Sequence, residues 1–519
     1  MNDSPRLDLD ALTLDGIRAG ALADVPAVVL GLARTGVALA RFLFDAGARV
    51  TIYDAKPVGA LAEAIAALEG RPVMLACGPD QDPATAWAGA ALVAFSPSIT
   101  PGIPTTEPRL RAALDGLAAR VAAGEAGAPA LVSEPDLFLR LCPAPTVGVT
   151  GTKGKTTTSS LAAHLLAGDP GHPVVLGGNI GTPLIDLLLA LTPDHRVVDE
   201  LSELQLPSLS RGTTVALYTN VTADHLDRHG SLEAYRRVKR RLAELVDPEG
   251  ALVLNLDDPV VAGYAGLGTA PSVCYRLERP IPGGLGIVDG WVVAAGVERL
   301  PLAGGGAAAT GPGGRILPVG EFPLPGSHNR ANLLAATGVA LLFGIAPDAI
   351  RRQATSFRGV EHRLELVAEI DGVRFVNDSQ GTQPDAVAAA LRSFEAPLVL
   401  IAGGRDKGVD LAALGPLVAA RASAAVLIGE SGPYLASLFR SAGVPLVEEA
   451  GTLGVALPRA AAIARELLGG APAGTVATVL LSPAAASFDQ FPDYAARGRA
   501  FKDGVAALAA ARATTAARR

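Results

Sequence analysis

Residues 145–168 contain a short apolar run, a glycine-rich loop and a segment of helical pattern, in that order. The run 145–150 has the length and composition of a buried strand, and apolar residues recur at helical spacing from Thr156 onward. Between them, residues 150–157 read Thr-Gly-Thr-Lys-Gly-Lys-Thr-Thr. A strand that turns through glycines into a helix can cradle phosphate, because loop N–H groups and the positive end of the helix converge on one point. The pattern therefore predicts an α/β fold with an anion site at this turn.

Lysine is scarce in this chain. Six of its 44 lysine and arginine residues are lysines, and two of these, Lys153 and Lys155, lie in the loop. A lysine kept among so many arginines indicates a task for a compact ammonium group. We therefore predict that Lys155 binds phosphate and that Thr156 or Thr157 holds Mg²⁺. Val149 stands where the usual phosphate loop has its first glycine, so this is a shortened variant, and a plain glycine turn is the alternative interpretation.

Length, charge and cysteine content limit the class of protein. A chain of 519 residues is expected to form two to four domains, and its net charge of −7 leaves no basic surface for nucleic acid. Cys77, Cys142 and Cys274 form no metal or redox motif, which fits a reducing cytoplasm. No apolar run reaches about 18 residues, and the acidic N-terminus does not resemble a signal peptide. We expect a cytoplasmic monomer with neither nucleic-acid nor membrane partners.

The pattern of strands and helices divides the chain into three α/β segments. Residues 27–36 predict a strand, a glycine turn and a helix, and the next strand, 49–53, ends at Asp54, as in a nucleotide-binding βαβ unit. Residues 92–97 predict another strand that ends in a loop, and prolines mark a linker at 129–135.

The later segments follow the same pattern. Residues 260–320 predict β hairpins and loops, and four strands are predicted after Gly359, at 373–376, 397–402, 424–428 and 475–481. The C-terminal Ala-Arg tail is predicted to be a frayed helix end. We therefore predict three domains: Rossmann-like 1–132 with an irregular extension over 1–24, a central P-loop ATPase-type domain over 133–359, and a Rossmann-like C-terminal domain over 360–519.

Asparagine is as scarce as lysine, with seven residues in the chain, and six of them lie in short polar clusters at predicted strand or helix ends. Polar amides in so apolar a chain indicate binding sites. The clusters are 177–181, 200–206, 220–229, 235–239, 255–258, 326–332 and 377–382.

The order of these clusters resembles that of the Mur ligase family, the ATP-dependent amide-forming enzymes of peptidoglycan precursor synthesis. The resemblance extends from about residue 27 to about residue 505. Within the family, the chain is similar to the branch that joins glutamate to UDP-N-acetylmuramoyl-L-alanine. The resemblance implies ATP and Mg²⁺ as cofactors, these two compounds as substrates, and an acyl-phosphate intermediate.

The resemblance also assigns roles to residues. For ATP binding, it implies Gly151, Thr152, Lys153, Gly154, Lys155, Thr156, Thr157, Asn329, Asn332, Arg363 and Asp378. For catalysis, it implies Lys155, Glu200, His225 and Lys239, and for the metal, Thr156, Glu200, His225 and Lys239 as a carbamate. For the UDP substrate, it implies Arg34, Thr35, Gly36, Asp54, Ser96 and Asn179. For glutamate, it implies Thr382, Lys407, Ser487, Phe488 and Tyr494.

Two of these assignments have an alternative interpretation. Lys239 matches the position of a carbamylated lysine, a modification that an amine can undergo and a guanidinium cannot. In so basic a run, Lys239 could instead be one more cation on a solvated helix face. His225 and His229 have the spacing of a zinc pair, but no third ligand motif lies near them.

The chain also departs from the family pattern. Gln380 replaces the usual lysine, Ala485 the usual cysteine and Ser98 the usual glycine. The change at Gln380 removes a positive charge and leaves the stereochemistry of the glutamate open. Three alternatives remain: an L-glutamate-adding variant, a different ligase of the folylpolyglutamate type, and a catalytically dead ATP-binding sensor of UDP-muramoyl compounds.

Overall fold

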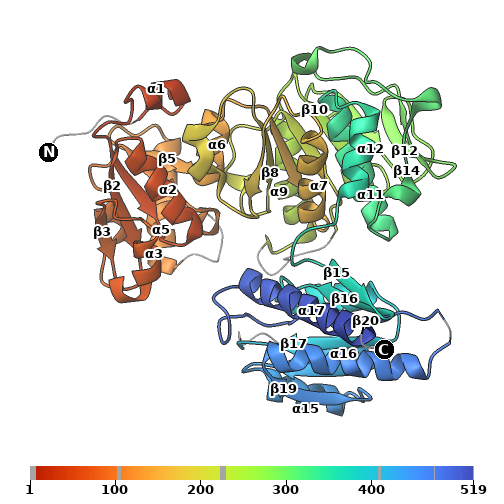
Figure 1. The fold of residues 1–519 in the computed structure, drawn as a ribbon. Helices are drawn as coiled ribbons and strands as arrows, with labels where there is room; N and C mark the ends of the chain where they lie inside the picture. Colours follow the sequence, from red (N-terminus) through yellow and green to blue (C-terminus); the bar gives the residue numbers. More distant parts are fainter. Residues whose placement is uncertain (1–6, 102–106, 223–228, 407–410, 473, 518–519) are drawn as a thin grey trace. The chain divides into compact units, whose positions relative to one another are not determined.

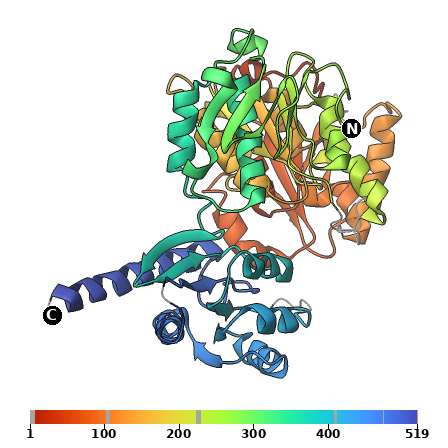
Figure 2. The same ribbon diagram turned by 90° about the vertical axis from the view of Figure 1, so that its right-hand side faces the viewer.

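The computed structural model describes residues 7–101, 107–222, 229–406, 411–472 and 474–517 (Figure 1). The chain forms two compact units, Met1–Phe357 and Arg358–Arg519. The first unit contains two β-sheets and the second contains one. Helices pack beside each sheet, which confirms the predicted α/β fold class (Figures 1 and 2).

The first sheet is parallel and has the strand order β3-β2-β1-β4-β5. The chain leaves β1 toward β2 on one side and later returns to β4 on the other, so the carboxyl end of β1 is the point where the strand order reverses. In sheets of this kind, ligands bind at such a point. The elements are β1 (Pro26–Leu30), α2 (Arg34–Asp45), β2 (Arg49–Asp54), α3 (Ala62–Ala66), β3 (Met74–Cys77), α4 (Pro83–Ala86), β4 (Leu92–Phe95), α5 (Pro108–Ala122) and β5 (Ala130–Ser133).

Two segments are more regular than predicted. Within the extension predicted to be irregular, residues 14–18 form helix α1 (Leu14–Arg18), and Leu14 and Ile17 are buried in the core of the first sheet. The predicted linker at 129–135 instead contains β5 and the start of α6 (Glu134–Leu141). Pro135 does not interrupt α6, because proline is tolerated in the first turn of a helix, where its missing N–H would have no helical partner.

The second sheet has nine strands in the order β14-β13-β12-β11-β10-β9-β6-β8-β7. Strands β6 to β11 pair in parallel, whereas β12, β13 and β14 pair antiparallel and confirm the hairpins predicted at 260–320. The strands are β6 (Thr146–Thr150), β7 (Val174–Gly178), β8 (Arg196–Glu200), β9 (Val215–Tyr218), β10 (Ala251–Asn255), β11 (Ser272–Tyr275), β12 (Gly284–Val288), β13 (Trp291–Ala295) and β14 (Arg315–Pro318). The helices are α7 (Lys155–Leu166), α9 (Leu232–Leu245), α10 (Pro259–Ala262), α11 (Ser327–Leu342) and α12 (Pro347–Ser356).

The second unit has one six-stranded sheet in the order β15-β16-β20-β17-β18-β19. The four predicted strands are confirmed, and two edge strands were missed because charged residues interrupt their apolar pattern. The strands are β15 (Glu365–Ile370), β16 (Val373–Asn377), β17 (Leu398–Gly403), β18 (Ala424–Ile428), β19 (Val447–Gly451) and β20 (Ala477–Leu481). The helices are α13 (Pro384–Arg392), α14 (Leu414–Arg421), α15 (Gly432–Ser441), α16 (Leu453–Gly469) and α17 (Tyr494–Ala517), the last of which includes the tail predicted to fray.

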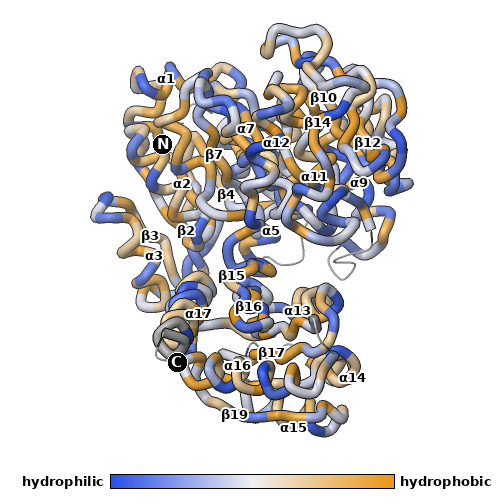
Figure 3. Tube along the Cα trace, turned by 45° about the vertical axis from the view of Figure 1, so that its right-hand side comes forward, coloured by the Kyte–Doolittle hydropathy of each residue, from blue (hydrophilic) through white to orange (hydrophobic). Residues whose placement is uncertain are grey.

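The apolar residues lie mainly on the strands and on the helix faces that cover them (Figure 3). Central strands such as β10 and β17 are buried along their whole length. Among the described helices, none has both the length and the apolar composition needed to cross a membrane.

Candidate active site

The loop between β6 and α7 has the geometry expected of a phosphate cradle. Gly151 and Gly154 have φ values of 143° and 86°, and a Cβ at Gly151 would lie 2.0 Å from Thr219 Oγ1. Both positions therefore require glycine. The Lys155 ammonium folds back over the loop and donates hydrogen bonds to the carbonyls of Gly151, at 3.0 Å, and Thr152, at 3.1 Å.

The residues that follow β9 hold this loop in place. The Asn220 side chain accepts a hydrogen bond from Lys153 N at 2.9 Å and donates one to Lys153 O at 3.0 Å. Its own carbonyl accepts a hydrogen bond from Thr152 N, and Thr219 Oγ1 donates to Lys153 O at 2.7 Å. These contacts were not predicted, although the scarcity of asparagine had marked the cluster that begins at Asn220.

Glu200 lies at the end of β8, directly beside Val149 of β6. Its side chain is buried, and Oε1 accepts a hydrogen bond from Asn179 Nδ2 at 2.9 Å. Its other oxygen, Oε2, is also buried and has no hydrogen-bond partner among the described residues. A buried carboxylate oxygen with a free lone pair beside a phosphate loop fits the hard oxygen ligands that Mg²⁺ prefers.

Lys239 lies on α9 and is fully buried, so the alternative of a solvated helix face is wrong. Its Nζ donates hydrogen bonds to Thr150 Oγ1 at 3.2 Å and to Gly151 O at 3.1 Å, and it lies 5.6 Å from the centre of the Tyr235 ring. The side chain therefore ends beside the phosphate loop, where the resemblance requires it. His225 lies outside the described residues, and so does most of the cluster around it.

Asn329 and Asn332, two side-chain amides predicted to bind ATP, lie near the start of α11, which packs against α7. Asn332 Oδ1 accepts a hydrogen bond from Thr158 Oγ1 at 3.0 Å, and Asn332 Nδ2 donates to Asn329 Oδ1 at 3.3 Å. A Cβ at Gly154 would lie 3.0 Å from Asn332 Oδ1. Asn332 therefore lies beside the start of α7, the helix that follows the phosphate loop, and Asn329 lies beside Asn332.

Most of the residues predicted to bind the UDP substrate lie at the carboxyl edge of the first sheet, whereas Asn179 follows β7 in the second sheet. Arg34, Thr35 and Gly36 begin α2, Asp54 ends β2, and Ser96 follows β4. Asp54 accepts hydrogen bonds from Leu32 N at 2.8 Å and Lys56 N at 2.9 Å, which fixes its carboxylate against the turn.

The C-terminal sheet carries its predicted site residues at its own carboxyl edge. Asp378 follows β16 and accepts hydrogen bonds from Ser482 Oγ at 2.7 Å and Leu364 N at 3.2 Å. Burial raises its pKa to about 6, and the nearby charge of Arg363 opposes that rise. Ser487 is buried, whereas Phe488 and Tyr494 are exposed.

Several features of this edge were not predicted. The buried Arg497 donates hydrogen bonds to Ser379 Oγ at 3.0 Å and to carbonyls that include those of Ser379 and Ala485, and so ties two site loops together. No motif in the sequence marks this arginine. Gln380 has a buried Oε1 that meets no hydrogen-bond partner in the described part of the chain. Lys407 lies outside the described residues.

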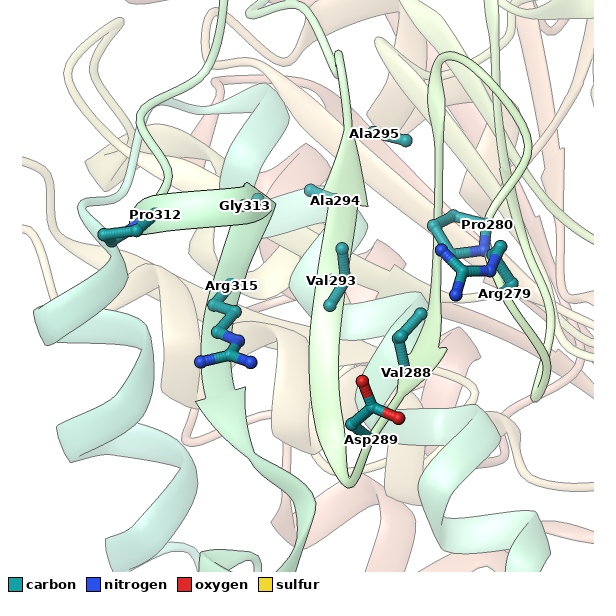
Figure 4. Close-up of a pocket in the computed structure, with 11 residues that line it drawn as sticks. Arg279, Pro280, Val288, Asp289, Val293, Ala294, Ala295, Pro312, Gly313 and Arg315 are labelled. Carbon is teal, nitrogen blue, oxygen red and sulfur yellow. The ribbon is translucent and has the colours of Figure 1, made fainter.

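The first unit also has a cavity of about 670 Å³ along the β12–β14 hairpins (Figure 4). Its charged lining residues are Arg279, Asp289 and Arg315. None of the residues that line it belongs to the predicted site, so it is separate from the candidate active site.

A buried acid, Glu134, lies where α6 meets the second sheet, and it supports a prediction about pH. It accepts a hydrogen bond from Ile185 N at 3.4 Å, and burial raises its pKa to about 7 from an ordinary value of 4.5. The folded state therefore loses stability as the pH rises from about 4.5 to 7, because ionisation of the buried acid costs on the order of 3 kcal/mol. We expect Glu134→Gln to raise the thermal unfolding midpoint relative to the wild type at pH 8 and to lose that advantage at pH 5.

The control for this prediction is Glu63→Gln, which changes an exposed carboxylate of the same unit. Its difference from the wild type should be small and similar at both pH values. An equal effect of Glu134→Gln at pH 5 and pH 8 would contradict the raised pKa.

Comparisons with known proteins give consistent results. The Mur ligase middle domain matches residues 149–340, and the Mur ligase glutamate ligase domain matches residues 362–485. The UDP-N-acetylmuramoylalanine–D-glutamate ligase of Symbiobacterium thermophilum is 38% identical over 94% of this chain and 100% of its own length. The enzyme of the same name from Acidobacterium capsulatum is 37% identical over 92% of this chain and 95% of its own length.

Solved structures of other proteins share the fold of this chain. The UDP-N-acetylmuramate–alanine ligase of Thermotoga maritima superposes with a TM-score of 0.53 at 18% identity, over 93% of this chain and 99% of that chain. MurF of Acinetobacter baumannii gives a TM-score of 0.51 at 14% identity, over 93% of this chain and 96% of that chain. At these identities, the likeness concerns the fold alone.

Proposed function

Because the chain belongs to the Mur ligase family, we propose that it joins D-glutamate to UDP-N-acetylmuramoyl-L-alanine with conversion of ATP to ADP and phosphate. The names of relatives that are 35–38% identical over most of the chain support this choice of substrates. The reaction is one step of peptidoglycan precursor synthesis. The three cysteines are free, which is consistent with a cytoplasmic location.

The observation that carries the proposal is the convergence of three side chains on one phosphate loop. Lys155 lies over the loop, Lys239 is buried beside it, and Glu200 ends the strand next to it. We propose that residues 1–132 hold the UDP substrate, 133–359 hold ATP and 360–519 hold glutamate. The support is that Arg34, Asp54 and Ser96 lie at the carboxyl edge of the first sheet and the phosphate loop lies at that of the second. Asn179 of the UDP-substrate set follows β7 in the second sheet, and Asp378 of the ATP set follows β16 in the third.

In the proposed reaction, a carboxylate oxygen of the muramoyl substrate bonds to the γ-phosphorus of ATP as the bond from that phosphorus to the ADP oxygen breaks. The loop N–H groups and Lys155 hold the phosphates and neutralise the charge that is transferred. The deprotonated amine of glutamate then attacks the carbonyl carbon of the acyl phosphate, and the C–O bond to phosphate breaks. The part played by the protein is mainly positioning and electrostatic stabilisation.

Mg²⁺ would be held by Thr156, Glu200, His225 and Lys239 as a carbamate. When bound, the metal supplies positive charge to the phosphate oxygens. The orphaned Glu200 Oε2 supports this assignment, and so does the burial of Lys239 beside the loop. Asn179 keeps Glu200 in position through its hydrogen bond to Oε1.

The function can be tested by offering D-glutamate and L-glutamate separately and analysing the product by mass spectrometry. We expect the UDP-muramoyl dipeptide with D-glutamate, together with phosphate release that depends on both the UDP substrate and glutamate. Product with L-glutamate alone would indicate the L-adding variant that Gln380 left open. Binding of the UDP substrate with no phosphate release would indicate a sensor.

A further inference from the structure

The segment 179–191 connects β7 to β8 in the second sheet, yet side chains from the part of the chain that forms the first sheet hold it. Arg34, the first residue of α2, donates hydrogen bonds to Gly181 O at 2.8 Å and Asn179 O at 3.3 Å. Arg41, on the same helix, binds both carboxylate oxygens of Asp186, at 2.6 and 3.2 Å.

Two further contacts fix the same segment. Arg18 of α1 donates hydrogen bonds to Leu191 O at 2.7 Å and Leu189 O at 3.1 Å. The apolar side chains of Leu184 and Leu188 are buried in the core that the first sheet forms. The segment is therefore anchored along its length to the part of the chain proposed to bind the UDP substrate.

The beginning of the segment determines the position of the candidate metal ligand. Asn179 N donates a hydrogen bond to Glu200 O at 2.8 Å, and Asn179 Nδ2 donates to Glu200 Oε1 at 2.9 Å. The preceding residue, Gly178, packs so closely that a Cβ there would lie 2.7 Å from Glu200 O and 2.1 Å from Asp199 Oδ1. A shift of Asn179 would therefore be transmitted to the Glu200 carboxylate.

We propose that Arg34 is a positioning residue that links the UDP-substrate turn to the metal ligand Glu200 through Asn179. This inference rests on the proposed function. The Arg34 guanidinium holds the carbonyl of Asn179. The backbone of Arg34 begins α2, the helix whose N-terminus would face the substrate diphosphate. Binding of the UDP substrate and binding of the magnesium nucleotide are then coupled, and each ligand strengthens the other by the same factor.

The test measures nucleotide binding in the absence of the UDP substrate, so that a lost contact to that substrate cannot produce the effect. Binding of AMP-PNP, a non-hydrolysable ATP analogue, to the full chain is measured by calorimetry with Mg²⁺ and, separately, with EDTA. We expect Arg34→Gln to weaken binding about threefold to tenfold with Mg²⁺ and to leave it unchanged with EDTA. Arg34→Lys, which keeps the charge but not the forked geometry, should recover part of the loss.

Arg49→Gln is the matched control. The Arg49 guanidinium also donates to a backbone carbonyl, that of Asp24 at 3.1 Å, but it does not touch the segment 179–191. Its variant should bind Mg²⁺ and AMP-PNP as the wild type does.

A second variant tests whether Arg34 acts through Asn179. Asn179→Ala removes the donor to Glu200 Oε1, and it should weaken only the Mg²⁺-dependent binding. Adding Arg34→Gln to Asn179→Ala should then cost less than Arg34→Gln costs in the wild type, because the side-chain part of the path is already broken.

The positioning role would be overturned if Arg34→Gln bound AMP-PNP with Mg²⁺ normally and only raised the KM for the UDP substrate. That result would leave the proposed function intact and make Arg34 a plain substrate contact. Failure of the wild type to form the dipeptide product would instead overturn the proposed function, whatever the variants bind.

Discussion

Replacing Lys155 with alanine is expected to lower the rate of phosphate release at least about 100-fold, because its ammonium lies over the loop where the transferred phosphoryl group would bind. The two carbonyls that it contacts belong to the loop backbone, which glycine geometry and Asn220 also hold. The variant should therefore keep its fold and its affinity for the UDP substrate. Steady-state phosphate release, circular dichroism and binding of the UDP substrate test these three expectations.

Lys502→Ala is the control for the loss of one lysine charge. Lys502 is partly exposed, and it forms ion pairs with Glu361 and Glu365. All three residues lie in the second unit, Arg358–Arg519. Both partners of Lys502 lie outside the phosphate loop, so this variant should retain most of its activity. Near-normal turnover of Lys155→Ala would contradict the phosphate-loop assignment.

Lys239→Ala is expected to lose nearly all activity, and small carboxylic acids should restore part of it. The side chain is fully buried and ends 3.1 Å from Gly151 O, so alanine leaves room beside the loop for formate or acetate. A bound carboxylate would supply the negative oxygen that we propose the carbamate supplies in the wild type. Activity is measured as phosphate release at increasing formate concentration.

The control is Arg237→Ala, which removes a 77% exposed side chain from the same helix and should neither lose activity nor respond to formate. A direct measurement is ¹³C NMR of the wild type equilibrated with ¹³C-bicarbonate, where a carbamate signal is expected that Lys239→Arg lacks. Full activity of Lys239→Ala without formate, or an absent carbamate signal, would rule out the modification.

Local patterns were sufficient to predict the elements that carry the site. The strand, glycine loop and helix at 145–168 lie within one continuous stretch, and so does the βαβ unit that ends at Asp54. Hydrophobic periodicity and glycine placement depend on neighbours in sequence, so they can be read without the fold. The sequence indicated Glu200 only through the family resemblance, and the parallel pairing of β6 with β8 in the structure places it beside the phosphate loop.

The strands that were missed and the segments that were misassigned have a common cause. β15 and β19 are edge strands in which Glu369 and Glu449 are exposed, so only their sheet neighbours define them. The prolines in 129–135 indicate a linker, but residues 130–133 pair with β4 in the structure and form strand β5. Local chemistry is ambiguous at these places, and distant hydrogen bonds select one structure.

The contacts by which distant residues support the site could not be found from motifs. Asn220 holds Lys153 across 67 positions, and Arg497 holds Ser379 across 118. Arg34 reaches Asn179 across 145 positions. Motifs therefore gave the groups proposed to meet the substrates, whereas packing between distant segments fixed which backbone and side-chain atoms hold those groups in place, because such contacts form only once the sheets have assembled.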